Sequence, residues 1–201
     1  MSFILATANP DKAREIREIL DGRVKLIPRP SDVPEVEETG ETLVENARLK
    51  AHALAVATGL PAIADDTGLE VAALDGAPGV YSARYAGDAA TYADNVAKLL
   101  EELQGKEGTE ARRARFATAA VAAWPDGTEL VAEGAVGGWI AARAAGSGGF
   151  GYDPVFVPAE GDGRTFAELV DEDPQAKHRL SHRARAFQAL ADALDNGGGP
   201  P

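Results

Sequence analysis

The sequence predicts an α/β fold: a mixed central sheet with flanking helices. Over the first half of the chain, short apolar runs that suit buried strands alternate with helical patterns, in the order strand, helix, strand, helix, strand. Two longer apolar segments follow at residues 114–124 and 130–136, and the turn sequence at 125–127 between them favours an antiparallel pair. Strands joined through helices and a later hairpin together predict a mixed sheet.

The first expected strand covers residues 3–6, and a helix follows it to residue 20. Ile16, Ile19 and Leu20 supply the apolar stripe of this helix. Its expected solvent face carries Arg14, Glu15, Arg17 and Glu18. A second strand is expected at 24–27, followed by an acidic loop over 28–40 that contains Asp32, Glu35, Glu37 and Glu38.

A capping box at Thr42 and Glu45 opens the longest predicted helix, which runs to about residue 58. An apolar run at 60–64 then predicts a buried strand that ends in a tight turn at residues 65–68. Residues 74–87 are expected to form an ordered loop, and residues 91–103 a third helix. Residues 104–113 are polar, so we expect them to be exposed.

In the last third of the chain, a glycine-rich loop at 146–158 leads into a short strand at 155–157. A short helix or turn is expected at 166–170, and an amphipathic helix at 183–194. Because no linker divides the chain cleanly, we expect one domain over residues 1–195. Residues 196–201 are Gly- and Pro-rich, and we expect a disordered tail there.

The composition of the chain excludes or disfavours several classes of function. Of the 201 residues 45% are hydrophobic and 26% charged, which is ordinary for a soluble globular protein. The net charge of −12 disfavours general nucleic-acid binding and anionic membranes. The absence of cysteine excludes disulfides, thiolate zinc sites and cysteine nucleophiles. No apolar run has the length of a membrane span, and the first residues lack the basic start of a signal peptide, so we expect a cytoplasmic protein.

The adjacent carboxylates Asp65 and Asp66 are the first candidate site. They stand at the carboxyl end of a predicted strand, where open α/β sheets place their ligands. Two neighbouring carboxylates repel each other unless a cation or hydrogen bonds compensate, and Mg²⁺ prefers such oxygen ligands. The alternative is a turn that only links two strands.

The loop at residues 7–12 is the second candidate. Backbone N–H groups at a helix start can bind a phosphate, as can the hydroxyl, carboxamide and ammonium groups of nearby side chains. It consists of Thr7, Ala8, Asn9, Pro10, Asp11 and Lys12. It lacks the pattern of a Walker loop. In the alternative, Asn9 or Asp11 only caps the helix and Lys12 lies in solvent.

The glycine-rich loop at 146–154 contains Gly-x-Gly-x-x-Gly, but Pro154 and the extended sequence after it exclude a dinucleotide-binding turn. In an extended segment Phe150 and Tyr152 point to opposite sides. One can then stack on a nucleobase while the other packs in the core; alternatively, both are core residues.

Residues 177–183 form a basic cluster in an acidic chain. His178 and His182 are four residues apart, but with no further His or Cys nearby a zinc site is disfavoured. The cluster either meets a substrate phosphate or base oxygen, or forms surface ion pairs with the acidic residues at 171–173. A serine hydrolase is excluded, because Gly-x-Ser-x-Gly is absent.

Taken together, these motifs resemble the inosine triphosphate pyrophosphatase family, which hydrolyses deaminated purine nucleoside triphosphates. The matching segments fall in the family's order at 7–12, 37–40, 45–47 with Lys50, 64–69, 76–85, 148–154 and 181–183. The resemblance implies two lobes around a nucleotide cleft, usually in a homodimer. It also implies Mg²⁺-dependent hydrolysis of dITP, ITP or XTP to the monophosphate and pyrophosphate. One departure is Pro10-Asp11, where many members carry smaller residues.

The resemblance also implies roles for single residues. Asp66 is the proton acceptor and a metal ligand, and Glu37, or its neighbour Glu38, is the second acidic residue that contributes to metal binding. Residues 7–12, with Thr7, Asn9 and Lys12 foremost, bind the triphosphate, and Thr67 contacts substrate. The residues implied for the base and its surroundings are Phe150, Gly151, Tyr152, Asp153, Lys177, His182 and Arg183.

Three other functions compete with this interpretation. One is a pyrophosphatase for other nucleoside triphosphates, and another is a nucleotide-binding sensor that does not cleave. The third is a scaffold protein, which would leave the aromatic loop and the basic cluster unexplained. Metal-dependent pyrophosphate release separates the enzymes from the sensor and the scaffold.

Overall fold

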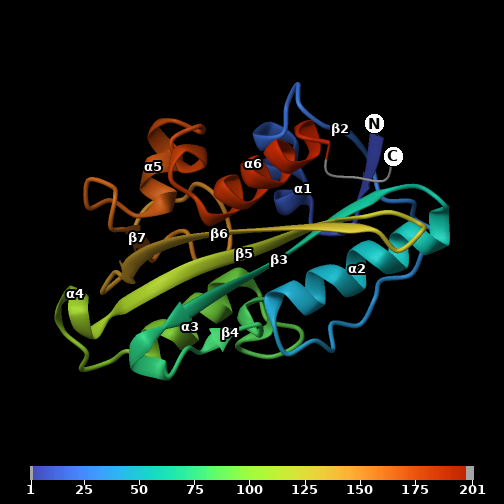
Figure 1. Cartoon of the computed structure of the whole chain (residues 1–201). Helices are drawn as coiled ribbons and strands as arrows, with labels where there is room; N and C mark the ends of the chain where they lie inside the picture. The colour runs from blue at the N-terminus through green and yellow to red at the C-terminus, as the bar shows by residue number, and fades with distance from the viewer. Residues whose placement is uncertain (1, 198–201) are drawn as a thin grey trace. The chain divides into compact units, whose positions relative to one another are not determined.

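A computed structural model describes residues 2–197 of the chain. The tail expected over 196–201 therefore lies, from residue 198 on, outside the described residues. The strands join in one sheet with the order β2-β1-β3-β5-β6-β7, and β4 pairs with β3. The pairs β1–β2 and β1–β3 are parallel, whereas β3–β4 and β6–β7 are antiparallel. The predicted α/β fold with a mixed sheet is confirmed (Figure 1).

The chain divides into two compact units, and each has its own core. Unit 1 comprises residues 1–66, 118–134 and 183–201, and unit 2 comprises 67–117 and 135–182. The long strands β3 (Ala62–Val71), β5 (Arg113–Ala123) and β6 (Glu129–Ile140) contribute residues to both units. A single domain over 1–195 stays a prediction.

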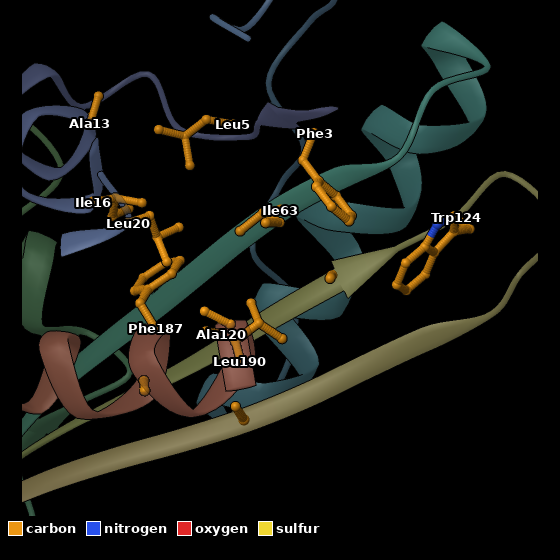
Figure 2. Packing of buried hydrophobic residues seen from close by; sticks show 14 residues of the cluster. Phe3, Leu5, Ala13, Ile16, Leu20, Ile63, Ala120, Trp124, Phe187 and Leu190 are labelled. Atoms are coloured by element: carbon orange, nitrogen blue, oxygen red, sulfur yellow. The ribbon is translucent and has the colours of Figure 1, made fainter. Parts of the chain in front are cut away.

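Unit 1 sandwiches strands between helices. Its elements are β1 (Ser2–Leu5), α1 (Pro10–Ile19), β2 (Lys25–Ile27), α2 (Leu43–Thr58) and most of α6 (His182–Asp195). Alternation along β1 sends Phe3 and Leu5 to the face covered by α1 and α6, while Ile4 and Ala6 pack towards α2 (Figure 1). Phe3 meets Trp124 edge to face at 5.5 Å between ring centroids (Figure 2).

Helix α2 packs closely because its buried face is built from small residues. Ala47, Ala51 and Ala55 are fully buried and face Ala62, Ala64 and other strand alanines. The predicted capping box is present: Thr42 Oγ1 accepts from the Glu45 amide, and the Glu45 carboxylate accepts from the Thr42 amide. These contacts fix the first turn of α2, which carries site residues described below.

Unit 2 contains shorter elements around an aromatic core. They are η1 (Ala72–Leu74), β4 (Pro78–Gly79), η2 (Ser82–Arg84), α3 (Tyr92–Glu102), α4 (Gly108–Ala111), β7 (Phe156–Pro158), α5 (Phe166–Glu172) and η3 (Lys177–Arg179). Phe116, Phe156 and Phe166 lie at the centre, and Leu69 and Leu99 pack with them. The predicted third helix is confirmed, and Thr91 is its N-cap.

Two local predictions are wrong and a third, exposure of residues 104–113, fails at Arg112, because buried polar groups found partners at these places. Strand β3 does not end in a turn at 65–68: it continues to Val71, because both carboxylates are paired with cations in the strand. Glu15 lies in the buried part of α1 rather than in solvent, and its carboxylate is bound by Arg183. Arg112, in the segment expected to be exposed, is buried and donates to the backbone carbonyls of residues 103, 106, 140 and 141.

Among residues 2–197, no helix combines the length and the apolar character needed to cross a membrane.

Candidate functional site

Asp65 and Asp66 are neighbours on β3, and alternation along the strand sends their side chains to opposite faces. On one face, Oδ2 of Asp65 lies 3.4 Å from Nζ of Lys12 and 3.4 Å from Nε of Arg183. On the other face, Oδ1 of Asp66 lies 3.0 Å from Nζ of Lys50. Both carboxylates are almost fully buried. The two carboxylates therefore form separate ion pairs on the two faces of the strand, where a single acidic turn was expected.

Lys50 joins Asp66 to the acidic loop. Its ammonium lies 2.7 Å from Oε1 of Glu38 as well as 3.0 Å from Asp66. Burial raises the pKa of Asp66 above its ordinary value, against the opposing effect of the Lys50 and Lys12 ammonium groups. Burial alone would lower the pKa of Lys50, but Asp66, Asp65 and Glu38 hold it above its ordinary value. Lys50 is therefore charged, and Asp66 is a carboxylate whose proton affinity is increased.

The donor set near Asp66 suits a hard cation. Within residues 2–197 no three His, Cys, Asp or Glu side chains gather closely enough to hold a metal by themselves. Mg²⁺ usually needs only one or two protein carboxylates, since substrate phosphates and waters complete its coordination. Asp66 and Glu38, which share Lys50, form such a pair. Glu37 is exposed, so of the two neighbouring glutamates Glu38 is the one that the structure brings to Asp66 through Lys50.

In the loop at 7–12 the structure shows the capping expected of Asn9, while phosphate binding stays a prediction. Asn9 is the N-cap of α1: its Oδ1 accepts from the amides of Asp11 at 2.9 Å and Lys12 at 3.1 Å. Thr7 Oγ1 in turn accepts from the Asn9 amide at 3.2 Å. Lys12 does not lie in solvent but points to Asp65. Capping thus fixes the loop, and Lys12 is held over a buried carboxylate; Ala8 and Pro10 are exposed.

Arg183 is buried in unit 1, where its guanidinium binds the carboxylates of Glu15 and Asp65. Sequence reasoning missed Glu15, because a single acid beside an apolar stripe reads as a solvent-facing residue. A role for Arg183 at the purine stays a prediction. In the structure it forms a buried network that spans α1, β3 and α6.

In unit 2, Asp153 organises the glycine-rich loop. Its Oδ2 lies 2.6 Å from Nζ of Lys177 and accepts from the Phe150 amide at 2.9 Å; both charged side chains are buried. Gly149 has a positive φ of 72°, and a Cβ there would lie 2.1 Å from Oδ2 of Asp153. Lys177 also lies 4.8 Å from the centroid of the Phe150 ring. The predicted residues Phe150, Asp153 and Lys177 thus form one cluster.

The two aromatic residues of this loop have different environments. Tyr152 is buried and its hydroxyl donates to the Ser82 carbonyl oxygen at 2.9 Å, whereas Phe150 is half-buried beside Tyr92. Burial raises the pKa of Tyr152, so its hydroxyl stays protonated. Tyr152 is thus a core residue and Phe150 is not fully buried, but the segment is a series of turns rather than extended. Stacking of Phe150 on a nucleobase stays a prediction.

The remaining predicted residues of unit 2 are His182, Thr67 and Gly151, of which His182 packs against the aromatic core. His182 is buried and stacks on Phe116, with ring centroids 4.4 Å apart. Thr67 follows Asp66 on β3 and is half-buried, and Gly151 has a positive φ of 63°. Of the basic cluster at 177–183, Arg179 forms the exposed ion pair with Asp173 that the alternative interpretation expects, at 2.7 Å.

Asn46 and Ser82 are buried polar residues that sequence reasoning did not assign to the site. Asn46 on α2 contacts Asp66, and Ser82 accepts from the Leu69 amide on β3 at 2.9 Å. A signal for Asn46 was present: it lies four residues before Lys50, beside the apolar stripe of the helix. For Ser82, a serine in a Gly- and Pro-rich loop gives no such signal.

The family model of the Ham1 family matches residues 3–193 of the chain. The dITP/XTP pyrophosphatase of Streptomyces coelicolor is 50% identical over 197 residues, covering 96% of each chain. The dITP/XTP pyrophosphatase of Rhodospirillum centenum is 46% identical over 191 residues, covering 94% of this chain and 92% of the relative. A HAM1 protein from Coxiella burnetii has a similar structure, with a TM-score of 0.85 at 42% identity, covering 98% of this chain and 99% of that one. The resemblance found in the sequence is thereby confirmed.

Proposed function

This chain belongs to the Ham1 family, and we propose that it hydrolyses deaminated purine nucleoside triphosphates (dITP, ITP and XTP) to the monophosphate and pyrophosphate. The names of its relatives, at 46–50% identity over nearly the whole chain, support this substrate class. The observation that carries the chemistry is Asp66: a buried carboxylate with a raised pKa, paired with Lys50 and joined through it to Glu38.

In this proposal Asp66 is the general base. Hydrolysis between the α and β phosphates needs a deprotonated water, and a carboxylate of increased proton affinity accepts that proton better than an ordinary one. Lys50, and Lys12 on the other face of β3, supply positive charge for the phosphates and the leaving pyrophosphate. Thr7, Asn9 and their neighbours in the loop at 7–12 are assigned to the triphosphate on the resemblance; the amides of Asp11 and Lys12 already donate to the Asn9 side chain.

We further propose that the enzyme uses Mg²⁺, bound through Asp66 and an acidic residue of the loop. Glu38 is favoured because it shares Lys50 with Asp66, and Glu37 stays the alternative. When bound, the cation would neutralise phosphate charge and lower the pKa of a coordinated water. In the structure the Lys50 ammonium binds both carboxylates, and Asp66 is the more deeply buried of the two.

The second part of the proposal concerns recognition of the purine base of the substrate. Phe150, half-buried beside Tyr92, is the ring available to stack on a purine, while Tyr152 is fixed in the core. Asp153 positions Lys177 and the loop amide of Phe150, and His182 lies buried on Phe116. Donors directed at a purine 6-oxygen disfavour the amino group of adenine at that position. Thr67, Gly151 and Arg183 are assigned to the substrate on the resemblance.

We propose a homodimer and a cytoplasmic location on the same resemblance, and the net charge of −12 supports a small-molecule substrate over nucleic acid. Sedimentation tests the dimer.

The function is tested by pyrophosphate release with Mg²⁺, comparing dITP or XTP with dATP and dGTP. A preference of about 100-fold or more for the deaminated purines supports the proposal, on the scale that a hydrogen-bonding site can reach. Equal turnover of all four nucleotides would agree with the proposed phosphate chemistry but would contradict the roles assigned to the residues around the purine. Tight nucleotide binding without turnover indicates a sensor instead.

A further inference from the structure

Asn46 connects Asp66 to the acidic loop through a single carboxamide. It lies in the first turns of α2 and is 1% exposed. Its Nδ2 donates to Oδ2 of Asp66 at 3.4 Å, and its Oδ1 accepts from the Gly40 amide at 2.8 Å. Gly40 is two residues after Glu38. The two ends of one side chain therefore reach the proposed base and the backbone of the loop that carries the proposed second carboxylate.

The loop backbone lies against Asn46 with no room for a side chain at residue 40. A Cβ on Gly40 would lie 2.7 Å from Oδ1 of Asn46 and 2.7 Å from Cβ of Glu45. One helical turn further along α2, Lys50 binds both Glu38 and Asp66. The loop and Asp66 are thus tied together twice from the same helix, once by a cation and once by a neutral amide.

Only an amide satisfies both contacts. An aspartate at position 46 keeps the acceptor for Gly40, but it lacks the donor and places a like charge beside Asp66. An alanine removes both contacts. The capping box of Thr42 and Glu45 fixes the helix start independently of the Asn46 side chain, so α2 itself can form in these variants.

The chain contains a second asparagine in the same setting, which provides a matched control. Asn95 follows the capping box of α3, as Asn46 follows that of α2. Its Oδ1 accepts from the Ala86 amide at 2.7 Å, and its Nδ2 donates to the Ala83 carbonyl oxygen at 3.1 Å. Asn95 therefore fixes a preceding loop as Asn46 does, but its donor goes to backbone and not to Asp66.

We propose that Asn46 is a positioning residue: its carboxamide holds the Asp66 carboxylate and the acidic loop in the one arrangement that catalysis needs. The inference rests on the proposed function of Asp66. It assigns to Asn46 a role in turnover that Asn95, the equivalent residue of α3, does not have.

The test compares Asn46→Asp, Asn46→Ala and Asn95→Ala for hydrolysis of dITP and for amide hydrogen exchange. Both Asn46 variants are expected to lose about 10- to 100-fold in kcat, the range for residues that orient ligating carboxylates, with little change in KM for dITP. The Mg²⁺ concentration for half-maximal rate is expected to rise in both. Asn95→Ala is expected to lower the Tm and leave kcat within about twofold, because its donor does not touch the site.

Hydrogen exchange of residues 37–41 reports on the contact between Asn46 and the Gly40 amide, independently of the contact with Asp66 and without a measurement of activity. Asn46→Ala is expected to expose these amides, whereas Asn46→Asp keeps the acceptor for Gly40 and protects them. Wild-type kcat in both Asn46 variants overturns the inference, as does an equal loss of kcat in Asn95→Ala. Unchanged exchange in Asn46→Ala also overturns it, whatever the chain hydrolyses. Failure of the proposed function would appear in the wild type itself, which would release no pyrophosphate.

Discussion

Nζ of Lys50 lies 3.0 Å from Asp66 and 2.7 Å from Glu38, so one buried cation serves two carboxylates. Lys50→Met keeps the length of the side chain and removes the charge. We expect at least a tenfold loss of kcat for dITP, because the charge that compensates both carboxylates is gone. Arg48→Met is the control on the same helix: its exposed ion pair with Glu129 touches neither carboxylate, so activity is retained. A Lys50→Met enzyme as active as Arg48→Met would contradict the assignment.

The Asp153–Lys177 pair predicts a charge-burial effect on stability. Both side chains are at most 3% exposed and lie 2.6 Å apart. Asp153→Asn removes the carboxylate charge that the buried Lys177 ammonium binds, at a cost of about 3–5 kcal/mol in the free energy of unfolding. Adding Lys177→Met removes the buried positive charge as well, so the double variant should be more stable than Asp153→Asn alone. Urea unfolding measures this, and a double variant less stable than the single one would disprove the explanation.

Ser82 predicts a loss of stability through two backbone groups. Its hydroxyl donates to the Gly79 carbonyl oxygen at 2.6 Å and accepts from the Leu69 amide at 2.9 Å. In Ser82→Ala the buried Leu69 amide loses its acceptor, and we expect the free energy of unfolding to fall by about 1–3 kcal/mol. Calorimetry checks the value. Tyr152→Phe removes only the donor to the Ser82 carbonyl oxygen and is the milder comparison; equal effects would argue against the hydroxyl as the anchor.

Asp94 in the capping box of α3 predicts a small pH effect on stability. Hydrogen bonds from the Thr91 hydroxyl and amide lower the pKa of Asp94 below its ordinary value. Since the folded-state pKa is depressed, the stabilisation is complete above the unfolded pKa and is lost as the pH falls through the folded one. Asp94→Asn should therefore lower the Tm at about pH 6, and its Tm should approach that of the wild type at about pH 2. A difference in Tm that is independent of pH would exclude this cause.

Local signals in the sequence were sufficient for most elements of the fold. The capping boxes at Thr42 and Thr91 mark the starts of α2 and α3, and the alanine-rich face of α2 predicts its close packing. Apolar runs locate most strands to within a few residues, although β3 continues past its run to Val71 and β4 lies in a segment expected to be a loop. These features depend on neighbours in the chain, which a sequence shows directly.

Long-range pairing of polar residues was not predictable in this way. The Asp-Asp-Thr-Gly sequence has the composition of a turn. It is strand because Lys12, Lys50 and Arg183, distant in sequence, neutralise its two carboxylates. Glu15 was placed in solvent for the same reason, because its partner Arg183 lies 168 residues away. Arg112 was placed there because a sequence does not show which backbone carbonyls a side chain will meet. The candidate residues could thus be chosen from the sequence, but the pairs they form could not.

The central claim is that Asp66 is the base in the hydrolysis of deaminated purine nucleoside triphosphates. The most direct measurement is pyrophosphate release from dITP by Asp66→Asn, with nucleotide binding measured on the same protein. The amide keeps the shape of the side chain but accepts no proton, so we expect kcat to fall by about 100- to 10,000-fold while dITP still binds. Wild-type turnover by Asp66→Asn would contradict the claim.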